Sequence, residues 1–155
     1  MFGLGYVGLS FALALKTAGW KVAGTCRSQA RKAALLELGL EAFVFDGESG
    51  EPEIRHRVVS SNAILSSVPP VDAGDPVLMM YSMDICNSSN SCWLGYLSTT
   101  GVYGDWGGGE VDETARLRAT SGRGIRRIAA ENSWLELVGK SAPQSHVFRL
   151  AGIYG

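Results

Sequence analysis

Three glycines near the start of the chain have the spacing of a phosphate-binding loop. They form the pattern Gly3-x-Gly5-x-x-Gly8 and run into a stretch that predicts a helix over about residues 7–18. In such a loop the first glycine permits a tight turn, the second lets a pyrophosphate approach the backbone, and the third lets the helix pack against a sheet. The helix N-terminus adds free N–H groups and the positive end of its dipole. The alternative is an ordinary strand-to-helix turn. The residues expected to bind the phosphates of a dinucleotide are Gly3, Leu4, Gly5, Tyr6, Val7 and Gly8.

The end of the next predicted strand distinguishes between two dinucleotides. That strand covers residues 20–26 and is followed by Arg27 and Ser28, with no carboxylate nearby. NAD sites usually place an acid there, about 20 residues past the glycines, to bind the ribose 2′-hydroxyl. A guanidinium suits a 2′-phosphate, so the sequence favours NADP over NAD, unless Arg27 is only a solvated loop residue. Asp46, at the end of the third strand, is expected either to bind the adenine amino group or to cap a turn.

Helix and strand patterns alternate along the 155 residues, which suffice for one domain with its own core. Further helices are expected at 29–38, from Asp75-Pro76 and from about Arg123, and further strands at 41–45, 63–70, 92–100 and 145–155. The polar residues 48–57 suggest no element. The apolar side of the last helix is expected at Ile125, Ile128, Leu135 and Val138. This alternation predicts an α/β protein with a mostly parallel sheet and helices on both faces.

Composition excludes several classes of protein. The net charge is −1 and like charges do not cluster, so neither nucleic acid nor an anionic membrane surface is an expected partner. The apolar run at 7–15 is too short to span a bilayer. The cysteines, Cys26, Cys86 and Cys92, fit neither a disulfide framework nor a zinc site. Neither His56 nor His146 has a second ligand or a nucleophile at a recognisable spacing, so no metal is expected. We expect a soluble intracellular protein, cytoplasmic by default, with an organelle as the alternative location, and the sequence leaves its oligomeric state open.

Four later segments are similar to those of a known family. They are LSTTGVYGD at 97–105, VDE at 111–113, RRIAAE at 126–131 and VFRLAGIYG at 147–155. In this order they resemble the extended short-chain dehydrogenases, the NAD-dependent epimerase/dehydratase superfamily, and GLGYVG with GTCRS resembles an atypical branch of it. The resemblance implies a Rossmann-type doubly wound parallel sheet. It also implies an oxidoreductase or sugar-nucleotide-modifying activity on a small molecule that the sequence does not name.

The resemblance also assigns residues to the cofactor and the substrate. Ser66 and Ser67 stand where the family lines the ribose and nicotinamide side of the cofactor, and Thr99 stands where the family holds a substrate oxygen. The family's catalytic Tyr-x-x-x-Lys is replaced by Arg123 and Arg127. Because an arginine stays protonated and only donates hydrogen bonds, Arg123 cannot shuttle a proton, whereas Arg127 could still bind a ribose or a phosphate.

Other residues could serve the missing proton transfer. Tyr103 follows Thr99 by four positions, and an arginine beside it would favour the tyrosinate. The competing interpretation makes Tyr103 a packing residue. Asp112 and Glu113 could orient a substrate hydroxyl or simply be solvated.

Members of the family carry a strand before the glycine loop and a substrate-binding segment after the last strand. Here only Met1 and Phe2 precede Gly3, so we expect a sheet that lacks most of its first strand and a chain that lacks the substrate segment. The missing strand would remove two ladders of backbone bonds, each bond worth about 1 kcal/mol. The flanking strands could pair directly instead. The alternatives to an enzyme are therefore a non-catalytic NADP-binding protein and an inactive fragment.

Overall fold

The computed structural model describes residues 1–88, 93–137 and 144–154, so Cys92 and Val138 lie outside the described residues. The helices are α1 (Tyr6–Thr17), α2 (Gln29–Glu37), α3 (Glu53–Ser60), α4 (Pro76–Cys86) and α5 (Gly122–Leu135), with a 3₁₀ helix η1 (Thr100–Tyr103). The strands are β1 (Ala23–Cys26), β2 (Glu41–Val44), β3 (Ala63–Ser66), β4 (Trp93–Thr99) and β5 (Ser145–Leu150).

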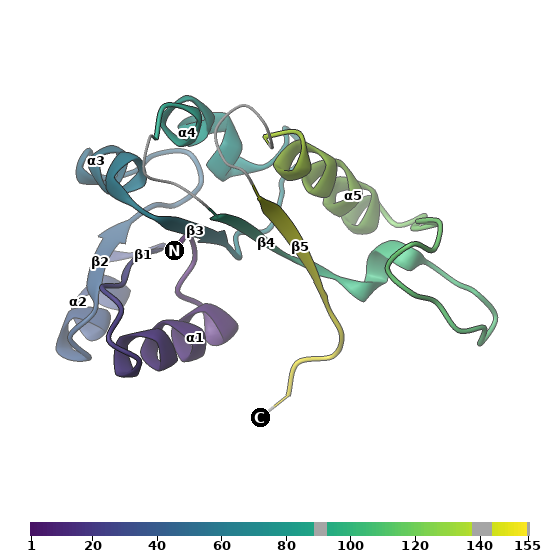
Figure 1. The fold of residues 1–155 in the computed structure, drawn as a ribbon, viewed down its shortest axis with the longest axis horizontal. Helices are drawn as coiled ribbons and strands as arrows, with labels where there is room; N and C mark the ends of the chain where they lie inside the picture. The colour runs from purple at the N-terminus through teal and green to yellow at the C-terminus, as the bar shows by residue number, and fades with distance from the viewer. Residues whose placement is uncertain (89–92, 138–143, 155) are drawn as a thin grey trace.

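All strand pairs are parallel. One sheet has the order β1-β2 and the other the order β3-β4-β5. Helices α1 and α2 lie on one side of the strands, and α3, α4 and α5 lie on the other (Figure 1). The predicted Rossmann-type doubly wound α/β fold is confirmed. Among the described residues, no helix combines the length and the apolar character needed to cross a membrane.

The first four residues of the chain lie between the two sheets and join them. On one side Phe2 donates from its nitrogen to the carbonyl of Leu65 (2.8 Å) and accepts from the nitrogen of Ser67 (2.9 Å). On the other side the nitrogen of Leu4 donates to the carbonyl of Thr25 (2.7 Å). The flanking strands β1 and β3 therefore do not pair directly, and this short segment takes the central place of the expected strand.

Phe2 also anchors the segment in the larger apolar cluster. Its ring lies 5.2 Å from that of Tyr81 on α4 and 6.0 Å from that of Phe45, measured between centroids. Phe2 and Tyr81 are almost completely buried. Leu4 is buried in a second cluster, with Ala12 and Leu35, between α1, α2 and the β1-β2 sheet. The segment thus belongs to both clusters as well as to both sheets.

Helix α3 lies in the stretch for which no element was expected. Only Ile54 and Val58, four residues apart, are well buried on it. Glu53 stands in its first turn and Arg57 in its last, where their charges complement the helix dipole. Two buried positions on one face are enough for a helix that packs against a neighbour, but too few to give a clear periodic pattern.

Helix α5 buries a different side from the predicted one. Ile125 is 54% exposed and Leu135 is 42% exposed. The buried side instead presents Arg127, Glu131 and Trp134 to the sheet. The apolar pattern was misleading because two charged residues lie inside, where they have partners on β4 and β5.

Candidate functional site

A cleft of about 530 Å³ lies where the glycine loop meets the ends of β1, β2 and β3. Gly3 and Gly5 line one part of it, and Arg27, Ser28 and Arg31 line another. The carboxyl ends of parallel strands are where open α/β sheets bind ligands. The structure therefore brings together the two sequence signals that predicted a dinucleotide, the glycine loop and the basic end of β1.

The glycines of the loop have different surroundings. Gly3 has a positive φ of 85°, and a Cβ there would lie 2.6 Å from the hydroxyl oxygen of Ser67. A Cβ on Gly8 would lie 2.2 Å from the carbonyl oxygen of Gly3. A Cβ on Gly5 would meet no atom within 4 Å. The fold itself requires Gly3 and Gly8, whereas Gly5 leaves open space beside the backbone in the cleft.

Helix α1 begins at this open space without a side-chain cap. Gly5 is its N-cap residue, and the first turn holds no acidic residue. In contrast, Ser28, Asp75 and Ser121 cap α2, α4 and α5 with their side chains. The first N–H groups of α1 are therefore left for a ligand or for water, and an anion is the favoured ligand at such a terminus.

The side chains of the other loop residues point in several directions. Leu4 is 2% exposed and belongs to the core, whereas Tyr6 is 62% exposed. Val7 is half-buried. Among these three, only Leu4 lines the cleft. Any contribution of Tyr6 and Val7 to binding would therefore come from their backbone N–H groups.

The basic part of the cleft contains one residue that the sequence analysis missed. The hydroxyl of Ser28 accepts a hydrogen bond from the nitrogen of Arg31 (3.2 Å) and so begins α2. Arg27 and Arg31 are exposed, and neither forms an ion pair with a carboxylate among the described residues. The neighbouring Lys32, in contrast, pairs with Glu51 at 2.7 Å. Arg31 could have been found from the predicted helix at 29–38, because it lies in the first turn of α2.

Asp46 lines the cleft with its carboxylate engaged in a turn. One oxygen accepts from the nitrogens of Glu48 (2.9 Å) and Ser49 (2.7 Å), and the other accepts from the hydroxyl of Ser49 (3.0 Å). The hydrogen bond from the Ser49 nitrogen is the main cause that holds the pKa of Asp46 below its usual value. Of the two interpretations of Asp46, the turn cap is the one visible here.

The two serines at the carboxyl end of β3, Ser66 and Ser67, have different surroundings. The hydroxyl of Ser67 lines the cleft and donates to the carbonyl oxygen of Gly3 (2.7 Å), so it holds the glycine loop in place. Ser66 is completely buried and does not line the cleft, and its hydroxyl accepts from the nitrogen of Val68 (3.4 Å). Ser67 is therefore the serine within reach of a ligand.

The structure does not bring Arg127 to the cleft. Its Nη1 donates to the hydroxyl of Tyr96 (2.9 Å) and to the carbonyl of Leu97 (2.8 Å), and the side chain is enclosed between α5 and β4. Burial raises the pKa of Tyr96 to about 12, so this tyrosine remains protonated. The expectation of a ribose or phosphate contact by Arg127 does not fit this placement. Arg123, at the start of α5, is exposed.

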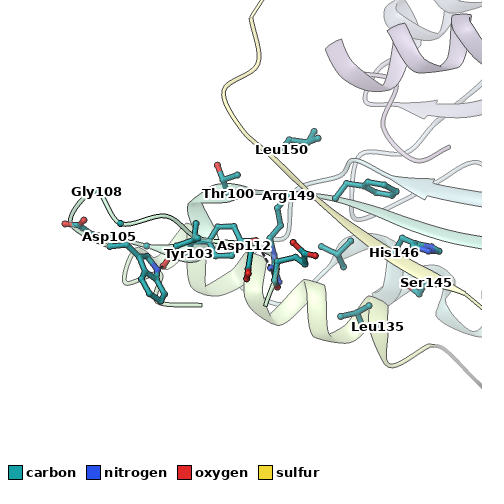
Figure 2. A pocket seen from close by; sticks show the side chains of 17 residues that line it. Thr100, Tyr103, Asp105, Gly108, Asp112, Leu135, Ser145, His146, Arg149 and Leu150 are labelled. Carbon is teal, nitrogen blue, oxygen red and sulfur yellow. Dashed lines mark hydrogen bonds between the residues drawn. The ribbon is translucent and has the colours of Figure 1, made fainter. Parts of the chain in front are cut away.

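A second, larger groove of about 1050 Å³ runs beside β5 and contains Tyr103 (Figure 2). The hydroxyl of Tyr103 accepts from Nη1 of Arg149 (3.0 Å), and the same guanidinium binds the carboxylate of Glu131 through Nη2 (2.9 Å). Glu131 is only 1% exposed, and this pairing is the main cause that raises the pKa of Arg149. Tyr103 thus belongs to a buried polar cluster, which agrees with its interpretation as a packing residue. It lines the groove beside β5, whereas the glycine loop lines the other cleft.

The remaining candidate residues have local partners. Thr99 accepts from the nitrogen of Gly101 (3.2 Å) and so begins η1. The carboxylate of Asp112 accepts from the hydroxyl of Thr114 (2.7 Å). The ring of His146 stacks on that of Trp93, with centroids 5.8 Å apart. Within the described ranges, no group of three histidine, cysteine or acidic residues could hold a metal ion.

Comparison with solved structures finds the same fold in several proteins. A functionally unknown conserved protein from Silicibacter pomeroyi is 39% identical, with a TM-score of 0.83, and the match covers 99% of this chain and 51% of that one. UDP-glucuronic acid 4-epimerase from Bacillus cereus, solved in complex with NAD, is 15% identical (TM-score 0.74), with coverage of 99% and 56%. A short-chain dehydrogenase/reductase superfamily protein from Agrobacterium tumefaciens with bound NAD is 17% identical (TM-score 0.68), with coverage of 96% and 47%.

The chain thus spans about half the length of these similar structures. No protein-family model matches the sequence, and a search of curated proteins finds no significant match. The established likeness is one of fold: the chain has the fold of epimerase and short-chain dehydrogenase structures that were solved with NAD.

Proposed function

We propose that the chain binds NADP(H) in the glycine cleft, as an atypical member of the NAD-dependent epimerase/dehydratase superfamily. The observation that carries the proposal is the open space beside Gly5. Packing does not require a glycine at this position, yet Gly5 stands at the uncapped N-terminus of α1. A pyrophosphate placed there would accept hydrogen bonds from the first N–H groups of the helix.

The preference for NADP rests on the basic end of β1. Arg27 and Arg31, which precede and follow Ser28 in the sequence, line the cleft together with it. The Ser28 hydroxyl accepts a hydrogen bond from Arg31 and can still donate one to a ligand. Guanidinium groups bind phosphate through paired, charge-assisted hydrogen bonds. Asp46 lies in the same cleft, but its carboxylate is engaged in its own turn and so leaves the 2′-position to the arginines.

For the chemistry, an oxidoreductase or a sugar-nucleotide-modifying activity suits the fold. The bound nicotinamide would supply or accept a hydride. Thr99, at the carboxyl end of β4, is the residue proposed to hold a substrate oxygen. Two other candidate side chains already have hydrogen-bond partners within the protein: Arg127 donates to Tyr96, and Tyr103 accepts from Arg149.

A non-catalytic dinucleotide-binding protein is the second candidate. Arg127 stands at the family's lysine position but lies in the interior with Tyr96 and Leu97. A chain without the tyrosine and the lysine can bind the dinucleotide and lacks the groups that transfer the proton. Clear turnover of any alcohol or sugar nucleotide in a broad panel would exclude this candidate.

The first test is a calorimetric titration of the purified chain with NADPH and with NADH. NADPH is expected to bind at least about tenfold more tightly, because each arginine contact with a phosphate contributes about 1.5–3 kcal/mol. Arg27→Gln and Arg31→Gln should each weaken NADPH binding about tenfold and leave NADH binding unchanged. Arg123→Gln, an exposed arginine outside the cleft, is the matched control. Equal affinities for the two dinucleotides would contradict the assignment of the arginines, and no binding of either would contradict the proposed function.

A further inference from the structure

Arg127 is a buried cation without an ion-pair partner. It is only 8% exposed, and no ion pair among the described residues includes it. Its guanidinium carbon lies 5.6 Å from the centre of the Tyr96 ring, which is a neutral partner. Arginine is rarely buried to this extent unless an anion compensates its charge, because an unpaired charge is costly to remove from water. The region between α5 and β4 therefore holds a positive charge that lacks a counterion.

Only one nitrogen of the Arg127 guanidinium has hydrogen-bond partners. Nη1 donates to the hydroxyl of Tyr96 and to the carbonyl of Leu97. Nε is buried and has no partner within the described ranges, and Nη2 donates no hydrogen bond there either. Arg149 uses the same two nitrogens to bind the carboxylate of Glu131, with Nε 3.2 Å and Nη2 2.9 Å from one oxygen. The edge of Arg127 that is equivalent to this carboxylate-binding edge is thus empty.

A second buried group without a partner lies on the same face of β4. The hydroxyl of Ser98 is buried and forms no hydrogen bond with any described residue. Because alternate residues of a strand share a face, Ser98 points to the same side as Tyr96, whose hydroxyl Arg127 contacts. Ser98 also follows Leu97, whose carbonyl accepts from Arg127. The structure therefore places two unsatisfied buried groups in one region beneath α5, where such groups are normally paired.

The carboxylates packed in this region already have other partners. Asp75 accepts hydrogen bonds from two backbone nitrogens at the N-terminus of α4 and from the indole of Trp134. That helix terminus compensates the charge of Asp75, and Arg149 compensates the charge of Glu131. Neither carboxylate pairs with Arg127. An additional anion is therefore the missing partner of this guanidinium.

A carboxylate is the anion that fits these groups. Its two oxygens match the parallel N–H bonds of a guanidinium edge, and a serine hydroxyl can donate a further hydrogen bond to it. The enclosed position favours a small planar group over a bulkier phosphate. The phosphates of a dinucleotide belong to the glycine cleft, which neither Arg127 nor Ser98 lines. A single water molecule could satisfy the same hydrogen bonds but would leave the charge uncompensated.

We propose that Arg127 and Ser98 form a binding site for the carboxylate group of a small molecule. The carboxylate accepts hydrogen bonds from Nε and Nη2 of Arg127 and from the hydroxyl of Ser98. The site lies close to the carboxyl end of β4, where Thr99 is the last residue, and this is the edge at which open α/β sheets bind ligands. The inference does not depend on dinucleotide binding.

The test observes the Nε–H group of Arg127 directly. The ¹⁵N-labelled 155-residue chain is titrated with sodium formate, the smallest carboxylate, and its arginine Nε–H signals are followed by NMR. The Arg127 signal should shift and saturate with a dissociation constant of about 1–10 mM. The Arg149 signal is the internal control, because its Nε already binds Glu131. Sodium chloride at matched ionic strength separates a carboxylate from anions in general.

Serine variants make the test specific to the site. Ser98→Ala should weaken formate binding about tenfold, because it removes one donor to a charged group. Ser133→Ala, at an exposed position on α5, is the matched control and should leave formate binding unchanged. Circular dichroism confirms that each variant is folded. NADPH titration of the same samples reports the glycine cleft separately, so the two proposals can fail independently.

Arg127→Lys tests the paired geometry. A lysine keeps the positive charge but lacks the two parallel donors, so the rise of the unfolding midpoint with formate should be lost. The same variant identifies the Arg127 signal by its absence. If the variant does not fold, through-bond NMR assigns the signal in the wild type, and the formate titration alone decides.

Four results would overturn the inference. The first is an Arg127 Nε–H signal that does not move up to about 100 mM formate. The second is an equal shift with sodium chloride, which would make the site one for any small anion. The third is undiminished formate affinity in folded Ser98→Ala. The fourth is a crystal structure grown with formate in which a water molecule alone joins Nε of Arg127 to the Ser98 hydroxyl.

Discussion

Gly5 and Gly8 belong to the same motif but stand in different environments. Gly8 is in contact with the carbonyl of Gly3, so any side chain there would displace the loop. Gly5 has open space around it. At the scale of single residues, the structure therefore separates a glycine that the fold needs from one that only a ligand would need.

Gly5→Ala is expected to leave stability within about 1 kcal/mol of the wild type, because the reduced freedom of the unfolded chain offsets a slightly poorer helix cap. It should weaken NADPH binding at least about tenfold by placing a methyl group beside the pyrophosphate. Gly8→Ala should instead destabilise the fold, by about 1–3 kcal/mol. Denaturant unfolding and calorimetric titration measure both effects, and undiminished NADPH affinity in Gly5→Ala would contradict the placement of the pyrophosphate.

Tyr103 and Arg149 allow a second prediction at this scale. Arg149→Met leaves the carboxylate of Glu131 buried and unpaired, so a loss of about 3–5 kcal/mol is expected. Tyr103→Phe removes one hydrogen bond while the ion pair remains, and should cost about 1 kcal/mol. Urea unfolding tests both values. Tyr103→Phe should also leave NADPH affinity unchanged, because Tyr103 lies outside the glycine cleft.

At the scale of elements, one carboxylate connects α4 with α5. Asp75 caps α4 by accepting from the nitrogens of Val77 (2.9 Å) and Leu78 (3.0 Å). Its other oxygen accepts from the indole nitrogen of Trp134 on α5 (3.0 Å). Burial is the largest influence on this carboxyl group and raises its pKa above the ordinary 3.8 despite these three hydrogen bonds.

The raised pKa gives Asp75 a definite pH dependence. Because the folded state holds the proton more tightly than the unfolded state, Asp75 favours folding most at pH values below 3.8, and that advantage is lost as the pH rises through the folded pKa. The stability of Asp75→Asn relative to wild type should therefore improve as the pH increases from about 3.5 to about 7. Urea unfolding across that range provides the measurement.

Asp46 provides the opposite case. Its pKa is lowered, so its favourable contribution is present above pH 3.8 and is lost as the pH falls through the folded pKa. Asp46→Asn should accordingly lose stability relative to wild type as the pH rises over the same range. The same trend in both variants would contradict the assigned directions.

The segment between the two sheets is the element with the largest expected effect on stability. Phe2→Ala removes a ring that packs against Phe45 and Tyr81, and a loss of about 3–5 kcal/mol is expected from the cavity. Phe11→Ala, at a 44% exposed position on α1, should cost less than about 1 kcal/mol. Thermal unfolding compares the two, and similar midpoints would show that the two sheets do not depend on this segment.

For the whole molecule, local patterns predicted the order of helices and strands, whereas partners far apart in the sequence decided which charged side chains are buried. The glycine motif and the alternation of strands and helices are local signals, and they led to the correct fold. Glu131 is buried because Arg149 reaches it from β5, 18 residues later, and no pattern within α5 reveals that partner. Arg127 is turned inward for a similar reason, through Tyr96 on β4.

The same distinction applies to the candidate site. Arg27 and Ser28 could be located from the sequence because they follow directly after a strand that leads to the cleft. Arg31 could have been added to them, because it lies in the first turn of the helix expected at 29–38. In contrast, the place of Tyr103 outside the cleft depends on the path of the chain after β4. The sequence also could not show that four residues suffice to join the two sheets.

The segment between the sheets has a consequence for synthesis on the ribosome. Residues 1–4 leave the exit tunnel before either of their neighbours, and the partners on the β3 side, Leu65 and Ser67, are made only after β1, α2, β2 and α3. Long-range pairings of this kind form late, because loop closure precedes the contacts that reward it. Until Ser67 has emerged, the aromatic ring of Phe2 has no finished core to enter, so this apolar side chain stays exposed in the nascent chain.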